Sequence, residues 1–350
     1  MNKVNYQTCK NLEYNYMWFW GDLDDCAPEL TLSFCCTKFT KAIAVPLCND
    51  PDESFAKFIS RKKEIINESK RMHHASASQN PYYKACAGCD NFRENVNRPD
   101  VETDKIHHIT FGINPAPCQA KCIYCSTRLE KRKALDKTTD APAFELFLKH
   151  IKHFRKKGLL ADEIVWTLGA GEITIHPFRD KIYEAIGNDC ARWLSNCFIY
   201  DPIIGINLNS NPRSELIFSI DAGTPKTWHK IKGVDNFNQV NENVLKYIQS
   251  ANNHAEQIVL KYLLLPGIND DIKNFSKFIN FVNQLKIKRV CISKNNQVAS
   301  NEAQIMSAST LAFLLLKEGL TPTYNIFNFD DIYRIYEIAD ALHLRHKAQQ

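Results

Sequence analysis

The sequence predicts an α/β fold: a partial, open (β/α)6 barrel with a small cysteine-rich domain before it and a helical extension after it. Three observations lead to this prediction. Strand-like and helix-like stretches alternate from about residue 106 onward, which is typical of parallel βα units. The stretch 106–294 allows about six units of roughly 30 residues each, fewer than the eight of a closed barrel. A hydrophobic fraction of 44% can fill the core of such a domain.

Each strand expected in the barrel is a short run rich in β-branched and aromatic residues. These strands are 106–113, 162–168, 203–208, 215–220, 257–265 and 289–293. The helices expected between them carry apolar residues three or four positions apart. They are 142–157, 178–186, 240–248 and 271–285. Ligands of such folds bind at the carboxyl ends of the strands, so residues that directly follow a strand are the candidates for function.

The chain is expected to divide into three domains. Residues 1–100 differ in pattern from the rest: 28–48 alternates as short strands do, and 53–72 has helical periodicity. Residues 105–294 form the barrel. Residues 295–350 are predicted to form a helix, a short strand and a second helix that cover the barrel.

Charge and hydropathy exclude some classes of protein. The net charge of +5 is only mildly basic, which makes nucleic acid an unlikely partner. No stretch approaches the roughly 18 apolar residues that a membrane span needs, and no secretory signal opens the sequence. We therefore expect a cytoplasmic protein with no membrane partner. In that compartment, thirteen cysteines indicate thiolates that hold metal rather than a disulfide framework.

The strongest single motif is CQAKCIYC, which places Cys118, Cys122 and Cys125 just after the first predicted barrel strand. Three thiolates so close together can hold three irons of a [4Fe–4S] cluster and leave the fourth iron without a protein ligand. An open iron can bind a cofactor or a substrate directly. Zinc is the alternative, although zinc sites more often use CxxC pairs.

The spacing CxxxCxxC after the first strand of a βα series, with the aromatic Tyr124 before the last cysteine, resembles the radical SAM superfamily. The resemblance implies a TIM-like barrel in which Cys118, Cys122 and Cys125 ligate a [4Fe–4S] cluster. It also implies that the open iron binds S-adenosyl-L-methionine (SAM), whose adenine lies near the backbone of Tyr124. An electron from a donor such as flavodoxin or ferredoxin would then cleave SAM to methionine and a 5′-deoxyadenosyl radical.

A glycine-rich segment follows the second predicted strand, where the family carries its GGE motif. Here it reads LGAGE, with Gly169, Ala170, Gly171 and Glu172. The resemblance implies that this segment and the Glu172 carboxylate hold the amino group of SAM. The sequence departs from the family by Ala170 in the middle of the motif. Taken alone, GAGE is as well explained by a turn that starts a helix.

Two further segments resemble SAM-contacting parts of the family. FSIDAGT follows the predicted fourth strand, and Ser219 and Asp221 are its candidates for binding the ribose and methionine of SAM. An Asx turn that ends the strand is the alternative for Asp221. INLNSN lies where the family has a turn after its third strand, so Asn209 is a further candidate.

Cysteines also gather in the N-terminal hundred residues. Their order resembles the SPASM and twitch domains, which hold auxiliary iron–sulfur clusters, although those domains usually follow the barrel. We therefore expect a second [4Fe–4S] cluster here, and a structural zinc from the same residues is the alternative. The candidate ligands are Cys26, Cys35, Cys36, Cys86 and Cys89, with Cys9 as an alternative to Cys26.

These features together predict a radical SAM enzyme whose substrate the sequence does not identify. Auxiliary-cluster members of the family often modify peptides or proteins, so such a substrate is our first hypothesis. Two other classes are weighed against it. One is a SAM-dependent RNA-modifying enzyme, and the other is a non-catalytic iron–sulfur or zinc protein on a decayed barrel.

Overall fold

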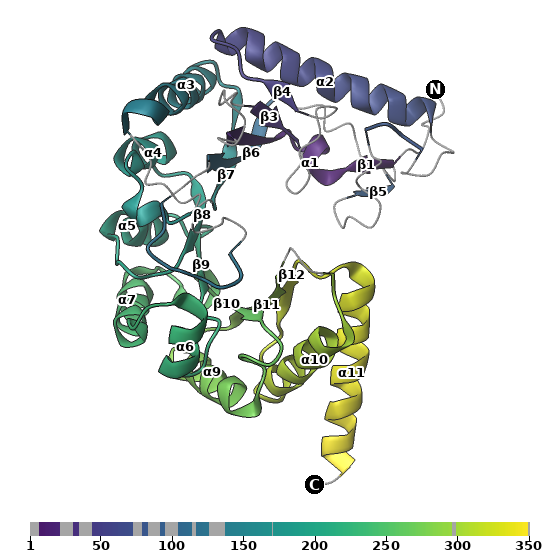
Figure 1. Cartoon of the computed structure of the whole chain (residues 1–350). Helices are drawn as coiled ribbons and strands as arrows, with labels where there is room; N and C mark the ends of the chain where they lie inside the picture. The colour runs from purple at the N-terminus through teal and green to yellow at the C-terminus, as the bar shows by residue number, and fades with distance from the viewer. Residues whose placement is uncertain are drawn as a thin grey trace. The chain divides into compact units, whose positions relative to one another are not determined.

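The computed structural model describes residues 7–21, 31–34, 44–72, 79–82, 92–94, 104–113, 117–125, 137–169, 171–295 and 299–348. The chain forms two units. The first comprises Met1–Pro117 with Lys133–Ala191, and the second comprises Cys118–Arg132 with Arg192–Gln350. Both units combine helices with a sheet that contains parallel strands (Figure 1), so the predicted α/β class is confirmed.

The sheet of the first unit has the strand order β4-β3-β2-β6-β7. Its strands are β2 (Tyr16–Gly21), β3 (Thr31–Ser33), β4 (Val45–Pro46), β6 (Ile106–Ile113) and β7 (Leu160–Leu168). Strand β6 runs parallel to both β2 and β7, whereas β3 is antiparallel to its two neighbours. A separate antiparallel pair consists of β1 (Gln7–Cys9) and β5 (Phe92–Glu94).

Aromatic packing holds two helices of the first unit, α2 (Pro51–Arg71) and α3 (Lys137–Lys156), against its sheet. The other helices of this unit are α1 (Lys10–Glu13), η3 (Ile173–Ile175) and α4 (Arg179–Ile186). The ring centroid of Phe147 on α3 lies 4.7 Å from Phe19 on β2 and 4.9 Å from Phe111 on β6. Phe58 on α2 stacks at 3.9 Å on Phe34, which directly follows β3. These rings are buried, and aromatic side chains remove a large apolar area from water.

The second unit is built on parallel strands in the order β8-β9-β10-β11-β12. They are β8 (Cys190–Ser195), β9 (Glu215–Ser219), β10 (Ile258–Leu264), β11 (Arg289–Lys294) and β12 (Thr323–Asn325). The helices are α5 (Pro202–Ser210), α6 (Pro225–Lys232), α7 (Phe237–Ser250), α8 (His254–Gln257), α9 (Ile272–Gln284), α10 (Glu302–Lys317) and α11 (Phe329–Ala348). No described helix is long and apolar enough to cross a membrane.

One predicted strand is wrong. Residues 203–208 lie within the helix α5, and the strand that precedes it is β8. The local sequence explains the helix: the Asp201 carboxylate accepts a hydrogen bond from the Ile203 N–H at 2.9 Å, and Pro202 occupies the first turn. Strand β8 has Arg192 at an exposed position, where it pairs with Glu215 of β9, so its apolar pattern is interrupted.

The N-terminal hundred residues contribute to the same sheet as the first predicted barrel strand, because β2 pairs with β6 from Tyr16 to Gly21. The sequence analysis did not predict β2. The division into domains at 1–100, 105–294 and 295–350 stays a prediction, as does the closure of six strands into one partial barrel. The helix predicted at 271–285 is confirmed as α9.

Candidate functional site

The loop that carries Cys118, Cys122 and Cys125 comprises residues 118–125 and is called here the cysteine loop. It is bonded to the end of α6. The Lys121 N–H donates to the Lys232 carbonyl at 2.8 Å, and the Ile123 N–H donates to the Ile231 carbonyl at 3.0 Å. Helix α6 ends at Gly233, which has a φ of 69°. These two main-chain bonds fix the loop next to a helix that follows β9.

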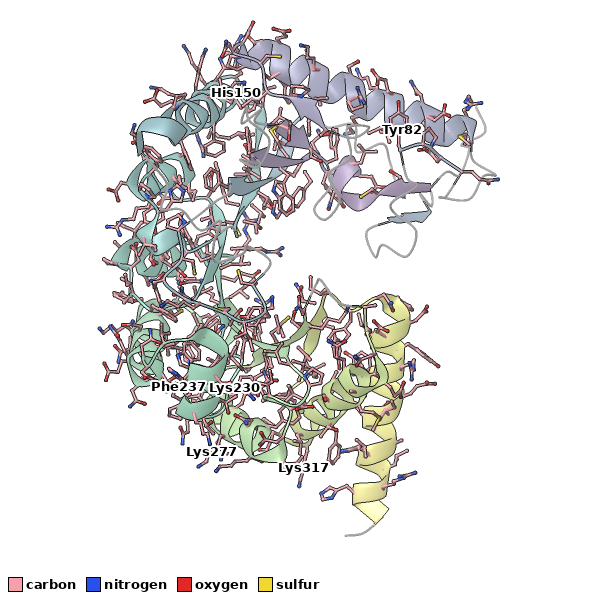
Figure 2. All side chains as sticks on the ribbon, viewed as in Figure 1. Tyr82, His150, Lys230, Phe237, Lys277 and Lys317 are labelled. Atoms are coloured by element: carbon pink, nitrogen blue, oxygen red, sulfur yellow. The ribbon has the colours of Figure 1, made fainter. Side chains whose placement is uncertain are left out.

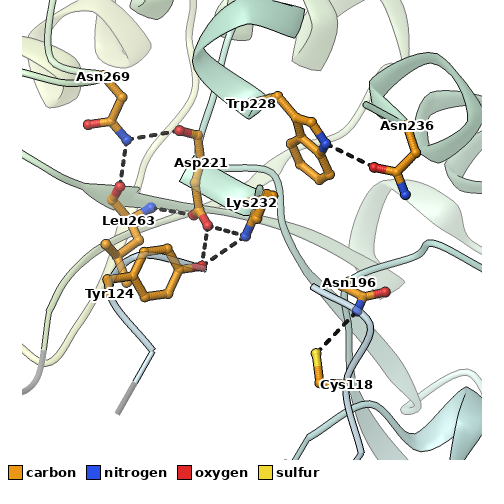
Figure 3. A network of polar contacts seen from close by, with 9 residues as sticks. All are labelled: Cys118, Tyr124, Asn196, Asp221, Trp228, Lys232, Asn236, Leu263 and Asn269. Carbon is orange, nitrogen blue, oxygen red and sulfur yellow. Dashed lines mark hydrogen bonds and ion pairs between the residues drawn. The ribbon is translucent and has the colours of Figure 1, made fainter. Parts of the chain in front are cut away.

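The side chains of Cys118, Cys122 and Cys125 are half-buried. Asn196, which directly follows β8, points its side-chain Nδ2 at the Cys118 sulfur, 3.6 Å away (Figure 3). Burial raises the pKa of the Cys122 thiol, and the positive charge of Lys232 acts in the opposite direction. Its contacts with Asn196, after β8, and Asp221, after β9, place the cysteine loop at the carboxyl ends of these two strands.

The chemistry of the three thiols fits an iron–sulfur cluster, since soft thiolates are the ligands that iron–sulfur centres use. As the side chains stand, no three His, Cys, Asp or Glu residues in the described part of the chain are grouped closely enough to hold a metal ion.

A buried polar network joins the cysteine loop to the strand ends (Figure 3). The Tyr124 hydroxyl donates to Oδ2 of Asp221 at 2.5 Å, and the Lys232 ammonium donates to the same Oδ2 at 2.5 Å and to the Tyr124 oxygen at 2.8 Å. The side chain of Lys232 is 2% exposed and that of Asp221 is 0% exposed. Burial, followed by the charge of Asp221, raises the pKa of Tyr124 well above its ordinary value. The phenol is therefore neutral and acts as a donor.

Asp221 ties two strand ends together as well as the loop. Its backbone has a φ of 51°, a left-handed conformation that is uncommon for a residue other than glycine. Its Oδ1 accepts from the Leu263 N–H at 2.8 Å, and its carbonyl accepts from the Asn269 side chain at 2.8 Å. Both carboxylate oxygens thus have protein partners, and the Asx-turn alternative does not describe these contacts.

The other candidate on this segment, Ser219, is the last residue of β9 and is half-buried. Binding of SAM by Ser219 and Asp221 stays a prediction. For Asp221, the contacts in the structure assign a different task, which is to hold Tyr124 and Lys232 in place.

In the first unit, Glu172 begins a short helix after β7. Its side chain is buried and accepts from the Thr174 hydroxyl at 2.9 Å and from the Thr174 N–H at 3.3 Å. Its own N–H donates to the carbonyl of Pro117 at 2.8 Å. Gly169 and Gly171 are exposed, and Gly171 has a φ of 69°. These contacts are those of the helix-starting turn, and the role of Glu172 toward SAM stays a prediction.

His176 lies at the end of this turn and was not among the predicted site residues. It is 3% exposed and packs among the rings of Phe111, Phe144 and Phe178. Its Nδ1 accepts from the Phe178 N–H at 3.2 Å, which places the ring proton on Nε2. Nε2 has no hydrogen-bond partner within the described residues, and burial lowers the pKa of His176 to about 4.

Asn209 does not lie at the carboxyl end of a strand, so its prediction as a residue of a third-strand turn is wrong. It is exposed on the last turn of α5, and its carbonyl accepts from the Asn252 side chain. The neighbouring Leu208 carbonyl accepts from Gln257, the residue before β10 begins. Asn209 is therefore at the amino ends of the strands. The residue that follows the third core strand is Asn196.

Several predicted ligands lie outside the described residues. They are Ala170 and the auxiliary-cluster candidates Cys26, Cys35, Cys36, Cys86 and Cys89. Cys9 lies within the described residues and is half-buried at the end of β1. The second cluster, or the zinc that is its alternative, stays a prediction.

The sequence analysis also missed Lys232, although the sequence contains a signal for it. Trp228 and Ile231 form the buried face of α6, and Lys232 follows Trp228 by four positions on that same face. A lysine at an inward-facing helical position needs a partner, because an unpaired buried ammonium is costly.

Comparisons with known proteins show only distant likenesses. No family model matches the sequence. A UPF0026 protein of Helicobacter pylori (strain ATCC 700392 / 26695) is 22% identical over 213 residues, which are 58% of this chain and 67% of that protein. Streptococcus suis SuiB bound to its precursor peptide SuiA aligns with a TM-score of 0.47 at 11% identity, over 92% of this chain and 71% of that one. A radical SAM methyltransferase from Sphaerobacter thermophilus aligns with a TM-score of 0.42 at 16% identity, over 60% and 63%. At this distance the function has to be argued from the residues of this chain.

Proposed function

We propose that this protein is a radical SAM enzyme, which uses a [4Fe–4S] cluster held by Cys118, Cys122 and Cys125. The observation that carries the proposal is the cysteine loop itself. Its three thiols lie on a short segment that main-chain bonds and a buried ion pair fix at the carboxyl ends of parallel strands. Three thiolates, rather than four, leave one iron of such a cluster open to a ligand.

When bound, the cluster supplies the electron that cleaves SAM reductively to give a 5′-deoxyadenosyl radical. The chain supplies binding and orientation. We assign the amino group of SAM to Glu172 with the Gly169–Gly171 segment, and the adenine to the backbone at Tyr124. Ser219 is the remaining candidate for the ribose, since the Asp221 carboxylate already has three donors.

The substrate class that we propose is a peptide or protein. The N-terminal cysteines, including the CxxC of Cys86 and Cys89, support it through their resemblance to auxiliary-cluster domains. A second [4Fe–4S] cluster at these cysteines is part of the proposal, and a four-thiolate zinc site is its alternative.

The test is the formation of 5′-deoxyadenosine. Protein reconstituted with iron and sulfide without oxygen, then given SAM and a strong reductant, is expected to release 5′-deoxyadenosine and methionine. A variant with alanine at Cys118, Cys122 and Cys125 is the matched control and should release none. Wild-type protein that binds iron and sulfide in full yet makes no 5′-deoxyadenosine above background with any reductant contradicts the proposal.

The same variant tests the second cluster. Iron that remains on it, about four per chain with brown absorption, indicates a separate cluster at the N-terminal cysteines. Zinc without iron favours the structural zinc, and neither metal means that residues 1–100 bind no cluster of their own.

A further inference from the structure

The ion pair between Lys232 and Asp221 is deeply buried, and both side chains contact Tyr124 of the cysteine loop. Its members are 2% and 0% exposed and lie 2.5 Å apart. Burial disfavours the charge of Lys232, but Asp221 acting together with Cys122 and Cys118 outweighs burial, so the pKa of Lys232 is raised. Two charges removed from water are retained only where their geometry and hydrogen bonds are well satisfied.

The surroundings of the ammonium meet this requirement. The Lys232 Nζ lies 5.3 Å from the ring centroid of Tyr124 and 5.4 Å from that of Trp228, a distance at which aromatic faces attract a cation. The Trp228 ring is itself fixed, since its Nε1 donates to Asn236 at 3.0 Å (Figure 3). The Lys232 side chain is therefore held in one position rather than free to sample others.

Lys232 contacts the cysteine loop with both its main chain and its side chain. Its carbonyl accepts from the Lys121 N–H before Cys122, and its ammonium binds the hydroxyl of Tyr124 after Cys122. Both contacts flank the middle cysteine within four residues of sequence. A single residue of α6 thereby fixes the segment that carries the thiols.

We propose that Lys232 is a positioning residue that, together with Asp221, locks the cysteine loop in one conformation before any metal binds. This inference rests on the proposed function for one point only, namely that the loop is held in place in order to bind a cluster. The locking itself is a property of the metal-free chain. It predicts that loss of the ammonium frees the cysteine loop locally, without loosening the rest of the unit.

The experiment measures alkylation rates of individual cysteines in the whole metal-free chain, by mass spectrometry of its peptides. In Lys232→Met, the rates at Cys122 and Cys125 should rise about 10- to 100-fold, because breaking a buried ion pair leaves Asp221 unpaired. The matched control is Lys230→Met, which removes an exposed lysine of the same helix (Figure 2) and should change the rates by less than about twofold.

Two buried cysteines away from the loop, Cys190 and Cys291, report unfolding in the same sample. Their rates should stay unchanged in Lys232→Met. The positive charge of Lys232 favours the Cys122 thiolate, so its loss alone would slow labelling. A faster rate therefore reports exposure of the thiol rather than higher reactivity.

A second variant keeps the test decisive if Lys232→Met does not fold. Tyr124→Phe removes only the hydroxyl and should raise the rates at the loop cysteines by about 2- to 10-fold, as expected for one lost hydrogen bond. Unchanged rates at Cys122 and Cys125 in the folded variants overturn the inference, and so does a rise in Tyr124→Phe that is equal at Cys190 and Cys291. The labelling result holds whether or not wild-type protein binds a cluster, so failure of the proposed function is recognised separately, by the absence of 5′-deoxyadenosine after reconstitution.

Discussion

The contact between Gly233 and the cysteine loop gives a prediction that can be worked from the structure. A Cβ at position 233 would lie 2.9 Å from the Cβ of Lys121, closer than the roughly 3.5–4.0 Å of a normal carbon contact. Lys121 cannot avoid it by rotating its side chain, because its Cβ is fixed by the backbone that donates to Lys232. Gly233→Ala must therefore displace the loop or the end of α6.

Two costs add in Gly233→Ala. A side chain in the left-handed region costs about 1–2 kcal/mol, and overpacking costs about 1–3 kcal/mol. The free energy of unfolding should fall by about 2–5 kcal/mol. Gly267→Ala is the matched control within the same unit, because Gly267 has a φ of 76° and an added Cβ would meet nothing within 4 Å. Gly267→Ala therefore carries only the cost of a side chain in the left-handed region.

Urea denaturation of the wild type and of both variants measures the difference. Gly233→Ala should lose about 1–3 kcal/mol more than Gly267→Ala, and it should also retain less iron after reconstitution. Equal losses in the two variants would refute the reasoning, since they would mean that the cysteine loop does not pack against Gly233.

Two further predictions concern the first unit. Glu172→Ala should weaken SAM binding by about 1.5–3 kcal/mol, or one to two decades in Kd by calorimetry, whereas Thr174→Val, which removes the hydroxyl bonded to Glu172, should leave Kd nearly unchanged. Equal Kd values for Glu172→Ala and wild type would leave Glu172 only its capping role. Because burial lowers the pKa of His176 from 6.5 to about 4, the unfolded chain binds more protons between these values, so stability should fall by up to about 3 kcal/mol as pH drops from 6.5 to 4. Denaturation at several pH values should show this loss in wild type and a smaller loss in His176→Phe; parallel curves would contradict it.

Sequence periodicity predicted the elements whose apolar pattern is long and regular. Helix α9 matches its predicted range because Phe275, Phe278 and Val282 repeat on one buried face. The run at 203–208 is apolar throughout, so its periodicity does not separate a buried strand from a helix. The deciding signal was Asp201 followed by Pro202, a helix start that outweighs the β-branched residues after it.

Because the spacing of the motif is local, it points to the three thiols, whose role as ligands stays a prediction. The residues that support their loop could not be predicted. The network that holds the cysteine loop joins Tyr124 to Asp221 and Lys232, which are 97 and 108 residues away in sequence. No short-range pattern encodes such contacts, and only the assembled strands bring them together. The unpartnered Nε2 of His176 likewise becomes visible only when the surrounding rings are in place.

The long sequence separation between Tyr124 and its partners Asp221 and Lys232 has a consequence during protein synthesis. A ribosome adds about 5–20 residues per second, and Asp221 follows Tyr124 by 97 residues. Tyr124 is therefore made roughly 5–20 seconds before Asp221. Throughout that interval Tyr124 has no carboxylate to bind, and Lys232, which comes later still, cannot accept the Lys121 N–H. The contacts that order the cysteine loop therefore cannot form until the chain has been made as far as Lys232. Any ligand that needs the ordered loop has to bind after that point.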